Sequence, residues 1–479
     1  MSSHYDAIVI GTGPAGLTAS SCLAEMGLKV LTLDEQNRIG GQIYRNIEHS
    51  SKDNLDKMGP EYRRGLDLAK RFRESGADYL GNSSVWNVES KGRVCYSREG
   101  SSHRVTANYI IVATGAMERP MPIPGWTLPG VMGAGAANNL AKEADLCPSG
   151  KVVLAGSGPL LLLEAGLLLK KGVDITAILE TTPKVPSPAV LPHLPSALRG
   201  TDFLLKGVNM LRDIKKSGVA HYKGVKDIRA LGDSQVTGVE AKYGDKILSF
   251  TADLLLTHFG VIPETHIYRL LECHMEWNKS QRYWYPSTDE WGRTNFEQIF
   301  AAGDGSGVSG ALAAEFKGEL AALEVAFCLG IIPQYERDQL AGPIQKELRQ
   351  DGYPRPLIDA VFAPDPKQFA FDDATVLCRC EYVTVGDVRK VVDEGVTDLN
   401  EMKIITRCGM GPCQGRMCGP ALGEIVAAEL DRPVPRAGLL KVRPPLKQVP
   451  LEEVAAMEIE SGGVDPANLF KNQGKKTGH

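Results

Sequence analysis

The chain has 479 residues, of which 43% are hydrophobic and 51 are glycine, and its formal net charge at pH 7 is -4. This length exceeds what one hydrophobic core organises, so we expect two or three domains. The small negative charge argues against nucleic-acid binding, and the glycine content is typical of a nucleotide-binding α/β protein.

The sequence predicts neither a secretory segment nor a membrane span. The first strand begins at residue 5, which leaves no room for a signal peptide. The most apolar stretch, residues 160–169, contains Glu164 and is much shorter than the roughly 20 residues of a membrane span. The expected location is the cytoplasm, and peripheral contact with the inner membrane stays open.

The first glycine motif predicts a dinucleotide site at the start of the chain. A hydrophobic strand over residues 5–10 leads into Gly-x-Gly-x-x-Gly, and a helix over 17–26 and a strand over 29–33 follow. Such a turn lets a pyrophosphate approach the backbone, and an acidic residue after the second strand accepts hydrogen bonds from ribose hydroxyls. The predicted contacts are Gly11, Gly13, Pro14, Ala15 and Gly16 of the turn, and Asp34 or the adjacent Glu35.

Two later segments resemble flavin-contacting parts of two-dinucleotide-fold flavoproteins. The sequence Gly40-Gly41-Gln42-Ile43-Tyr44-Arg45 is similar to the isoalloxazine-side loop of the thioredoxin-reductase-like branch, so Gly41 and Gln42 are predicted contacts. A hydrophobic strand from residue 110 ends in Ala113, Thr114 and Gly115, which resemble the A-T-G segment of these flavoproteins. We therefore expect FAD at the first site.

A second strand-into-glycine pattern predicts another dinucleotide fold, inserted into the first. The turn Gly156-Ser157-Gly158 is followed by a helix over residues 160–170 and a strand over 175–179 that ends at Glu180. Leu161 stands at the third glycine position, so strand–helix packing must differ from that of a nicotinamide site. A working NAD(P) site and a structural or vestigial fold both stay open.

The sequence Ala302-Gly303-Asp304-Gly305 completes the flavin motifs. It follows a predicted strand, precedes a helix of small residues, and resembles the flavoprotein G-D motif. In that motif the aspartate hydrogen-bonds the ribityl or pyrophosphate region from a helix N-terminus. Gly303 and Asp304 are therefore predicted FAD contacts.

Cysteines indicate a second centre in the C-terminal part, where five of the ten lie between residues 378 and 418. Cys378 with Cys380, and Cys413 with Cys418, form two close pairs that supply the four thiolates of an iron–sulfur cluster, and Cys408 is left over. Structural zinc is the main alternative, and chemically inert thiols are another. Zinc sites more often use Cys-x2-Cys pairs, so an iron–sulfur cluster is the preferred interpretation.

The remaining cysteines do not form the redox Cys-x-x-Cys of disulfide reductases. They are isolated, and we expect each of them to be a buried small hydrophobe; they are Cys22, Cys95, Cys147, Cys273 and Cys328.

The expected fold class is α/β, with two Rossmann-like dinucleotide-binding domains and a small, mostly α-helical cysteine domain. The expected boundaries are 1–125 and 291–330 for the two parts of the FAD-binding domain, 126–290 for the inserted NAD-binding-like domain, 331–372 for a linker, 373–430 for the cysteine domain and 431–479 for a C-terminal tail. Proline-rich residues 182–200 and 342–366 are predicted connecting segments, and the tail is expected to be exposed or to contact a partner.

Together, these motifs resemble the α subunits of multisubunit amine-oxidising dehydrogenases. This group includes opine dehydrogenases or oxidases, D-hydroxyproline and L-proline dehydrogenases, hydrogen cyanide synthase and the central part of the sarcosine oxidase α subunit. The resemblance covers nearly the whole chain and rests on the glycine motif, residues 40–45, Glu118-Arg119-Pro120, Pro124-Gly125-Trp126, residues 378–381 and residues 406–418.

The front end of this group has a pyridine nucleotide-disulfide reductase-like fold. Its C-terminal module is similar to bacterioferritin-associated ferredoxin, whose [2Fe-2S] ligands match Cys378, Cys380, Cys413 and Cys418. The resemblance therefore implies FAD and a [2Fe-2S] cluster on one chain.

The resemblance further implies an electron-transfer subunit of a hetero-oligomer, and it assigns no catalytic residue on this chain. A β subunit resembling D-amino-acid oxidases would oxidise a secondary amine or amino acid of the opine or D-hydroxyproline type, with FMN at the subunit interface. A small ferredoxin-like γ subunit is an optional further partner. Two other functions stay open: a stand-alone NAD(P)H-dependent FAD/[2Fe-2S] reductase, and a scaffold subunit whose sites only stabilise the assembly.

Overall fold

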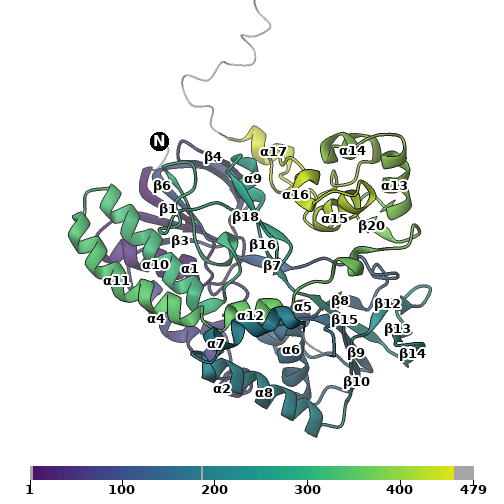
Figure 1. Cartoon of the computed structure of the whole chain (residues 1–479). Coiled ribbons are helices and arrows are strands. Elements are labelled where there is room, and N and C mark those ends of the chain that lie inside the picture. Colours follow the sequence, from purple (N-terminus) through teal and green to yellow (C-terminus); the bar gives the residue numbers. More distant parts are fainter. Residues whose placement is uncertain (1–3, 185–186, 458–479) are drawn as a thin grey trace, which may run out of the picture.

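The computed structural model describes residues 4–184 and 187–457 (Figure 1). Its N-terminal domain is built on a seven-stranded sheet of order β3-β2-β1-β6-β5-β4, with β19 paired to β6. The strands are β1 (His4–Ile10), β2 (Val30–Leu33), β3 (Asp78–Leu80), β4 (Ser84–Glu89), β5 (Arg93–Arg98), β6 (Ser101–Val112) and β19 (Ile299–Ala301). The part that holds β1, β2, β3, β19 and the end of β6 is parallel, as expected for a dinucleotide fold.

Two helices from distant parts of the chain cover this sheet together. α1 (Pro14–Glu25) starts directly after the first glycine turn and packs against α10 (Ala311–Cys328). Leu23 of α1 and Leu320 of α10 belong to one buried core. The two separated segments that were predicted to bind FAD therefore form a single domain.

The chain passes from the N-terminal domain into the inserted domain and back through two antiparallel strands, β7 (Ala116–Glu118) and β16 (Val261–Pro263). The parallel sheet of the inserted domain has the order β11-β10-β9-β15-β8. The strands are β8 (Val131–Gly133), β9 (Val152–Ser157), β10 (Ile175–Glu180), β11 (Ala220–Lys223) and β15 (Leu254–Phe259). α5 (Ala134–Ala144) and α6 (Pro159–Lys170) pack on this sheet, and α8 (Thr201–Lys216) packs on α6.

Two smaller sheets complete this half of the molecule. One is antiparallel, with β12 (Lys226–Leu231), β13 (Gly238–Tyr243) and β14 (Lys246–Thr251). The other is a hairpin of β17 (Met275–Asn278) and β18 (Tyr283–Pro286), which follows α9 (His266–Leu270).

The two proline-rich segments contain helices. η2 (Pro188–His193) and α7 (Leu194–Ala197) lie in the first, and α11 (Gln334–Asp351), α12 (Arg355–Val361) and η4 (Pro366–Phe369) occupy much of the expected linker. Val190, Ala197 and Leu357 form a buried cluster that joins the two segments. Several of these helices carry proline in their first turn, where the missing N–H removes no helical hydrogen bond.

The C-terminal domain is small and mostly helical, as predicted (Figure 1). It contains the hairpin β20 (Val376–Cys378) and β21 (Val383–Thr384), followed by α13 (Val385–Asp393), α14 (Leu399–Thr406), α15 (Gly419–Glu429) and α16 (Val434–Ala437). Thr384 and Asp387 form a capping box that starts α13.

Part of the described tail is buried within this chain, whereas the sequence predicts a tail that is exposed or contacts a partner. Leu440 is buried in the core of the C-terminal domain, and Val442 and Leu446 are buried against the N-terminal domain. The Leu446 N–H donates to the Trp86 carbonyl oxygen at 2.7 Å. Burial of these side chains removes apolar surface from water and fixes the two domains to each other. α17 (Leu451–Ala455) follows, and residues 458–479 lie outside the described part of the chain.

Within residues 4–184 and 187–457, no helix combines the length and the apolarity that crossing a bilayer requires.

Candidate functional site

The turn after β1 has the backbone that a bound pyrophosphate needs. Gly11 has a φ of 107°, and a Cβ there would lie 2.4 Å from the Ala113 carbonyl oxygen. A Cβ on Gly16 would lie 1.9 Å from the Gly11 carbonyl oxygen, so glycine allows α1 to pack closely on the turn. A Cβ on Gly13, in contrast, would have no heavy atom within 4 Å. Gly13 therefore borders open space at the N-terminus of α1, which attracts anions.

The two predicted acidic residues after β2 have different surroundings. Asp34 Oδ2 accepts from the Thr12 N–H at 2.7 Å and the Thr12 hydroxyl at 2.6 Å, and its Oδ1 accepts from the Gln36 N–H at 2.8 Å. Burial raises the pKa of Asp34, although these hydrogen bonds oppose the shift. Glu35 instead lies 2.9 Å from the Lys447 Nζ of the tail. Asp34, fixed at the glycine turn, is the better placed of the two to accept from a ribose.

The loop at residues 40–45 lies directly on the first glycine turn. A Cβ on Gly41 would lie 2.8 Å from the Gly13 Cα. Gln42 faces α5 of the inserted domain, since its Oε1 accepts from the Asn139 Nδ2 at 2.6 Å and its carbonyl from the Lys142 Nζ at 3.2 Å. Gly41 thus borders the predicted FAD site, and Gln42 connects it with the inserted domain.

The G-D motif, Gly303 with Asp304, lies beside the same glycine turn. Pro14 and Ala15 open α1, and a Cβ on Gly303 would lie 2.8 Å from the Ala15 Cβ. Asp304 Oδ1 accepts from the Ser309 and Gly310 N–H groups at 2.7 and 3.0 Å, next to the start of α10.

Thr114, in the A-T-G segment, has an unpaired hydroxyl next to this turn. Its hydroxyl is buried and has no hydrogen-bond partner among the described residues. An unpaired buried hydroxyl costs stability unless a ligand atom satisfies it. The open space at Gly13, the unpaired Thr114 hydroxyl and the acceptor Asp34 fit a dinucleotide such as FAD. When bound, FAD supplies hydride and one-electron chemistry.

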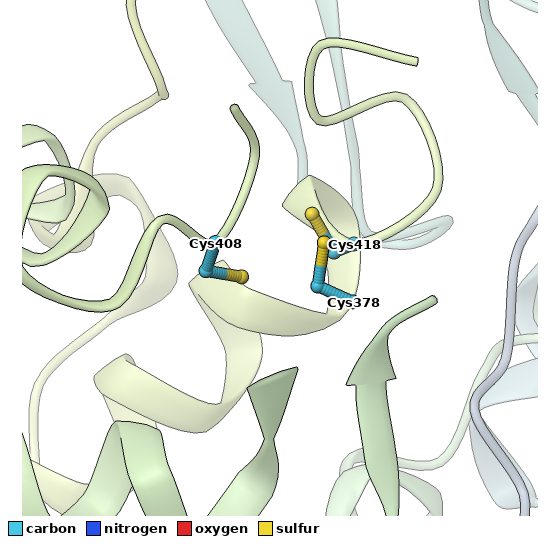
Figure 2. Close-up of side chains that lie close together, drawn as sticks. All are labelled: Cys378, Cys408 and Cys418. Atoms are coloured by element: carbon cyan, nitrogen blue, oxygen red, sulfur yellow. The ribbon is translucent and has the colours of Figure 1, made fainter. Parts of the chain in front are cut away.

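Five cysteines come together in the C-terminal domain, in two groups. The sulfurs of Cys378, Cys408 and Cys418 all lie within 4.8 Å of one another, and all three residues are buried (Figure 2). Cys378 ends β20, Cys408 follows α14, and Cys418 caps the N-terminus of α15. Cys418 thus stands at the positive end of the α15 dipole.

The three buried cysteines differ in the pKa of their thiols. Hydrogen bonds from Cys408 and Cys418 lower the pKa of Cys378 to about 2. Backbone N–H groups of Gly409 and Glu381 contribute to the same shift. The pKa values of Cys408 and Cys418 are raised, mainly because their thiols donate to Cys378. The loop therefore stabilises a thiolate, the form in which cysteine binds a metal.

Cys380 and Cys413 form the second group. Burial raises the pKa of Cys380, and Cys413 contributes both a backbone and a side-chain hydrogen bond to it. Cys380 is exposed and Cys413 half-buried, so this pair borders the surface side of the thiol group. All four predicted ligands and the leftover Cys408 thus lie in one sulfur-rich loop region, and an all-sulfur donor set fits an iron–sulfur cluster.

The isolated cysteines follow the expectation in part. Cys22, Cys95 and Cys273 are buried, whereas Cys147 and Cys328 are only half-buried.

A side chain occupies the second glycine turn. A Cβ on Gly158 would lie 3.2 Å from both Cδ2 and Nε2 of His258, and His258 Nδ1 lies 2.7 Å from a Glu118 carboxylate oxygen. His258 is 2% exposed, so its ring is held at the N-terminus of α6, where a dinucleotide would place its pyrophosphate. Leu161, at the third glycine position, is fully buried.

Glu180, the acidic residue that ends the second strand of this fold, already has side-chain partners. The Glu180 side chain is 1% exposed and pairs with His221 at 2.9 Å and Lys223 at 3.5 Å. Its pKa is lowered because these partners outweigh the burial that acts against ionisation. A nicotinamide dinucleotide at this turn would therefore meet the His258 ring, and its ribose would compete with His221 and Lys223 for Glu180.

Glu164 of α6 makes stability depend on pH. Its carboxylate accepts from the Asn138 Nδ2 at 2.8 Å, and burial raises its pKa from 4.5 to about 7. The folded state therefore binds its proton more tightly than the unfolded state, and stability falls as pH rises from 4.5 to about 7. Glu164→Gln should raise the free energy of unfolding by up to about 3 kcal/mol at pH 8 and by much less at pH 5.

Urea denaturation at both pH values measures this difference. Replacement of the exposed Glu290 by glutamine is the matched control. An equal effect of Glu164→Gln at both pH values would contradict the prediction.

Several residues that connect these sites were not predicted from the sequence: Glu118, His258, Glu264, His266 and Arg416. The polar side chains of Glu264, His266 and Arg416 meet between the flavin motifs and the cysteine loop. Glu118 and Arg416 lie in segments that carry the family resemblance, but no spacing in the sequence marks these contacts, since the residues meet only through the fold.

Comparison with known proteins gives a consistent result. Residues 5–326 match the family model described as pyridine nucleotide-disulphide oxidoreductase, and residues 375–458 match the sarcosine oxidase A3 domain. One subunit of the opine oxidase of Agrobacterium tumefaciens (strain Ach5) is 39% identical over 95% of this chain and 92% of its own length. The hydrogen cyanide synthase subunit HcnB of Pseudomonas protegens is 31% identical over 86% of this chain and 89% of its own length.

A solved structure supports the same fold. L-Proline dehydrogenase from P. horikoshii superposes with a TM-score of 0.68 at 20% identity, over 94% of this chain and 78% of that chain.

Proposed function

The chain belongs to the pyridine nucleotide-disulphide oxidoreductase family, in the group that contains these opine oxidase subunits, and on this basis we propose that it is the electron-transfer subunit of an amine dehydrogenase. The fold and relatives make it an oxidoreductase flavoprotein subunit. The proposal adds that its FAD and a [2Fe-2S] cluster relay electrons taken from a secondary amine or amino acid. The observation that carries it is the combination of a fitting dinucleotide site and a sulfur-rich loop on one chain.

The proposed ligand residues follow from the two sites. Gly11, Gly13, Gly16, Asp34 and Thr114 would hold FAD together with the remaining flavin motifs. Cys378, Cys380, Cys413 and Cys418 would hold the cluster, and Cys408 would lie beside it.

The proposed partner is a β subunit resembling D-amino-acid oxidases, which would oxidise the substrate, with FMN at the shared interface. The names of the relatives support a multisubunit enzyme, since they are subunits of opine oxidase and of hydrogen cyanide synthase. Contact with the inner membrane and a small γ subunit remain optional parts of this proposal. Opine or hydroxyproline-type substrates are the proposed class.

Co-expression with the adjacent genes tests this function. The purified complex should oxidise a secondary amine with an artificial electron acceptor, whereas the single chain should show no such activity. Amine oxidation by the chain alone would contradict the proposal.

The alternative function is a stand-alone NAD(P)H-dependent reductase. Two contacts argue against it. The His258 ring lies beside Gly158, where the second dinucleotide would place its pyrophosphate, and the Glu180 carboxylate is already paired with His221 and Lys223. Anaerobic NADH or NADPH should therefore leave the flavin absorbance of the isolated chain unchanged over minutes, while dithionite should bleach it. Rapid bleaching by either nucleotide would favour the alternative.

A further inference from the structure

One short segment contacts both the flavin motifs and the cysteine loop. It runs from Glu264 into α9, which lies between the N-terminal sheet and the C-terminal domain (Figure 1). The Glu264 N–H donates to the Gly115 carbonyl oxygen at 3.0 Å, so the segment begins at the flavin-motif turn. Glu264 Oε1 then accepts from the His266 backbone N–H at 3.0 Å and lies 2.8 Å from the ring Nδ1.

The other end of the segment reaches the cysteine loop through two side chains. His266 Nε2 lies 3.1 Å from the Gln414 carbonyl oxygen, and Arg416 Nε donates to Glu264 Oε2 at 3.2 Å. Arg416 also donates to the Cys413 carbonyl oxygen at 3.3 Å. Two hydrogen-bonded routes thus connect Gly115 with Cys413 and its neighbour.

These contacts are largely shielded from solvent, which strengthens them. The His266 side chain is 4% exposed, and those of Arg416 and Glu264 are 15% and 21% exposed. Burial acts against ionisation of Glu264, but hydrogen bonds from His266 and the charge of Arg416 keep its pKa below the usual range. A hydrogen-bonded network of this kind in a low dielectric holds its members in one arrangement.

The tail reinforces the same junction. Arg416 donates to the Leu446 carbonyl oxygen at 3.3 Å, and Arg269 of α9 donates to the Leu440 carbonyl oxygen. The tail therefore contacts both the cysteine loop, at Arg416, and α9, at Arg269.

We propose that Glu264, His266 and Arg416 couple the two redox sites: they are positioning residues that fix the Cys413 loop relative to the Thr114–Gly115 turn and provide the hydrogen-bonded path between them. This inference rests on the proposed function. With both groups bound, the flavin would give up one electron for each cluster that is reduced. The path would end at the backbone carbonyls of Cys413, a proposed ligand, and of its neighbour Gln414. Groups that contact ligands in this way tune both the orientation and the potential of a metal site.

The test uses the full chain with both cofactors bound, in two variants, His266→Leu and Arg416→Met. After rapid partial reduction by dithionite, stopped-flow absorbance gives the rate of electron transfer from flavin to cluster. Flavin and iron content should stay at the wild-type level, while this rate falls by about tenfold or more. Exposed His274, in the same part of the chain, provides the control variant His274→Leu, which should behave as wild type.

A second readout separates coupling from a purely structural role. Removal of the Arg416 charge should shift the cluster to a lower reduction potential in an EPR-monitored titration, because a positive charge favours the reduced, more negative cluster. If His266→Leu loses its cluster, the electron-transfer rate and the cluster potential of Arg416→Met alone test the proposed coupling. Wild-type rate and potential in a variant that keeps both cofactors would overturn this inference alone. A wild-type chain without a reducible cluster would overturn the proposed function and the inference with it.

Discussion

Serine in place of Cys413 is expected to abolish the EPR signal of the reduced cluster, whereas serine in place of Cys408 should leave it in place. An iron–sulfur cluster needs four thiolates, and a serine hydroxyl is a much poorer ligand for iron than a thiolate. The experiment compares iron, sulfide and EPR spin content of the dithionite-reduced variants with those of the wild type.

The comparison tests the choice of ligands, because the structure brings Cys408 close to two of the proposed ligands. Its sulfur lies within 4.8 Å of those of Cys378 and Cys418, while Cys380 is exposed. Full cluster content in Cys413→Ser together with its loss in Cys408→Ser would replace Cys413 by Cys408 in the ligand set. Equal spin content in both variants and the wild type would contradict a cluster at this loop.

Alanine at Gly13 should weaken FAD binding without destabilising the chain, whereas alanine at Gly16 should destabilise the chain itself. A Cβ on Gly13 meets no heavy atom within 4 Å, so the free energy of unfolding of the apoprotein should change by less than about 0.5 kcal/mol. The same methyl group points into the space proposed for the pyrophosphate, so we expect FAD affinity to fall by about tenfold or more.

The Gly16 variant is the matched comparison. Its Cβ would lie 1.9 Å from the Gly11 carbonyl oxygen, and relief of this overlap should cost about 2 to 3 kcal/mol of stability. Urea denaturation of the apoproteins and fluorescence titration with FAD separate the two effects. Wild-type FAD affinity in Gly13→Ala would contradict the proposed position of the cofactor.

The sequence predicts the glycine turns and their flanking elements well, because these features obey local rules. The strand before Gly11, the helix after it and the position of Asp34 all follow from neighbouring residues. The mostly helical cysteine domain was predicted for the same reason, since Thr384 with Asp387 and the apolar spacing after Cys418 signal helices directly.

Other features depend on the folded chain and left no local signal. Arg407, with a φ of 63°, ends α14 in a left-handed turn that brings Cys408 back toward Cys378. His266 and Gln414 lie 148 positions apart in sequence and meet only because α9 packs against the C-terminal domain.

The proline-rich segments contain more regular structure than their composition indicates. Prolines at the first turns of α7 and α12 are compatible with helices, whereas composition alone suggested connecting segments. The buried Leu440, Val442 and Leu446 show likewise that a few spaced apolar residues can fix a tail that lacks regular structure.

In the proposed function, electrons from an amine that is oxidised on a partner chain reach a cluster on this one. EPR of samples frozen milliseconds to seconds after a secondary amine is mixed with the anaerobic co-expressed complex measures this transfer directly. We expect a reduced [2Fe-2S] signal that appears with the amine, fails to appear in the isolated chain, and is lost in a complex that carries Cys413→Ser. A complex that oxidises the amine while its cluster stays oxidised would contradict electron relay through this chain.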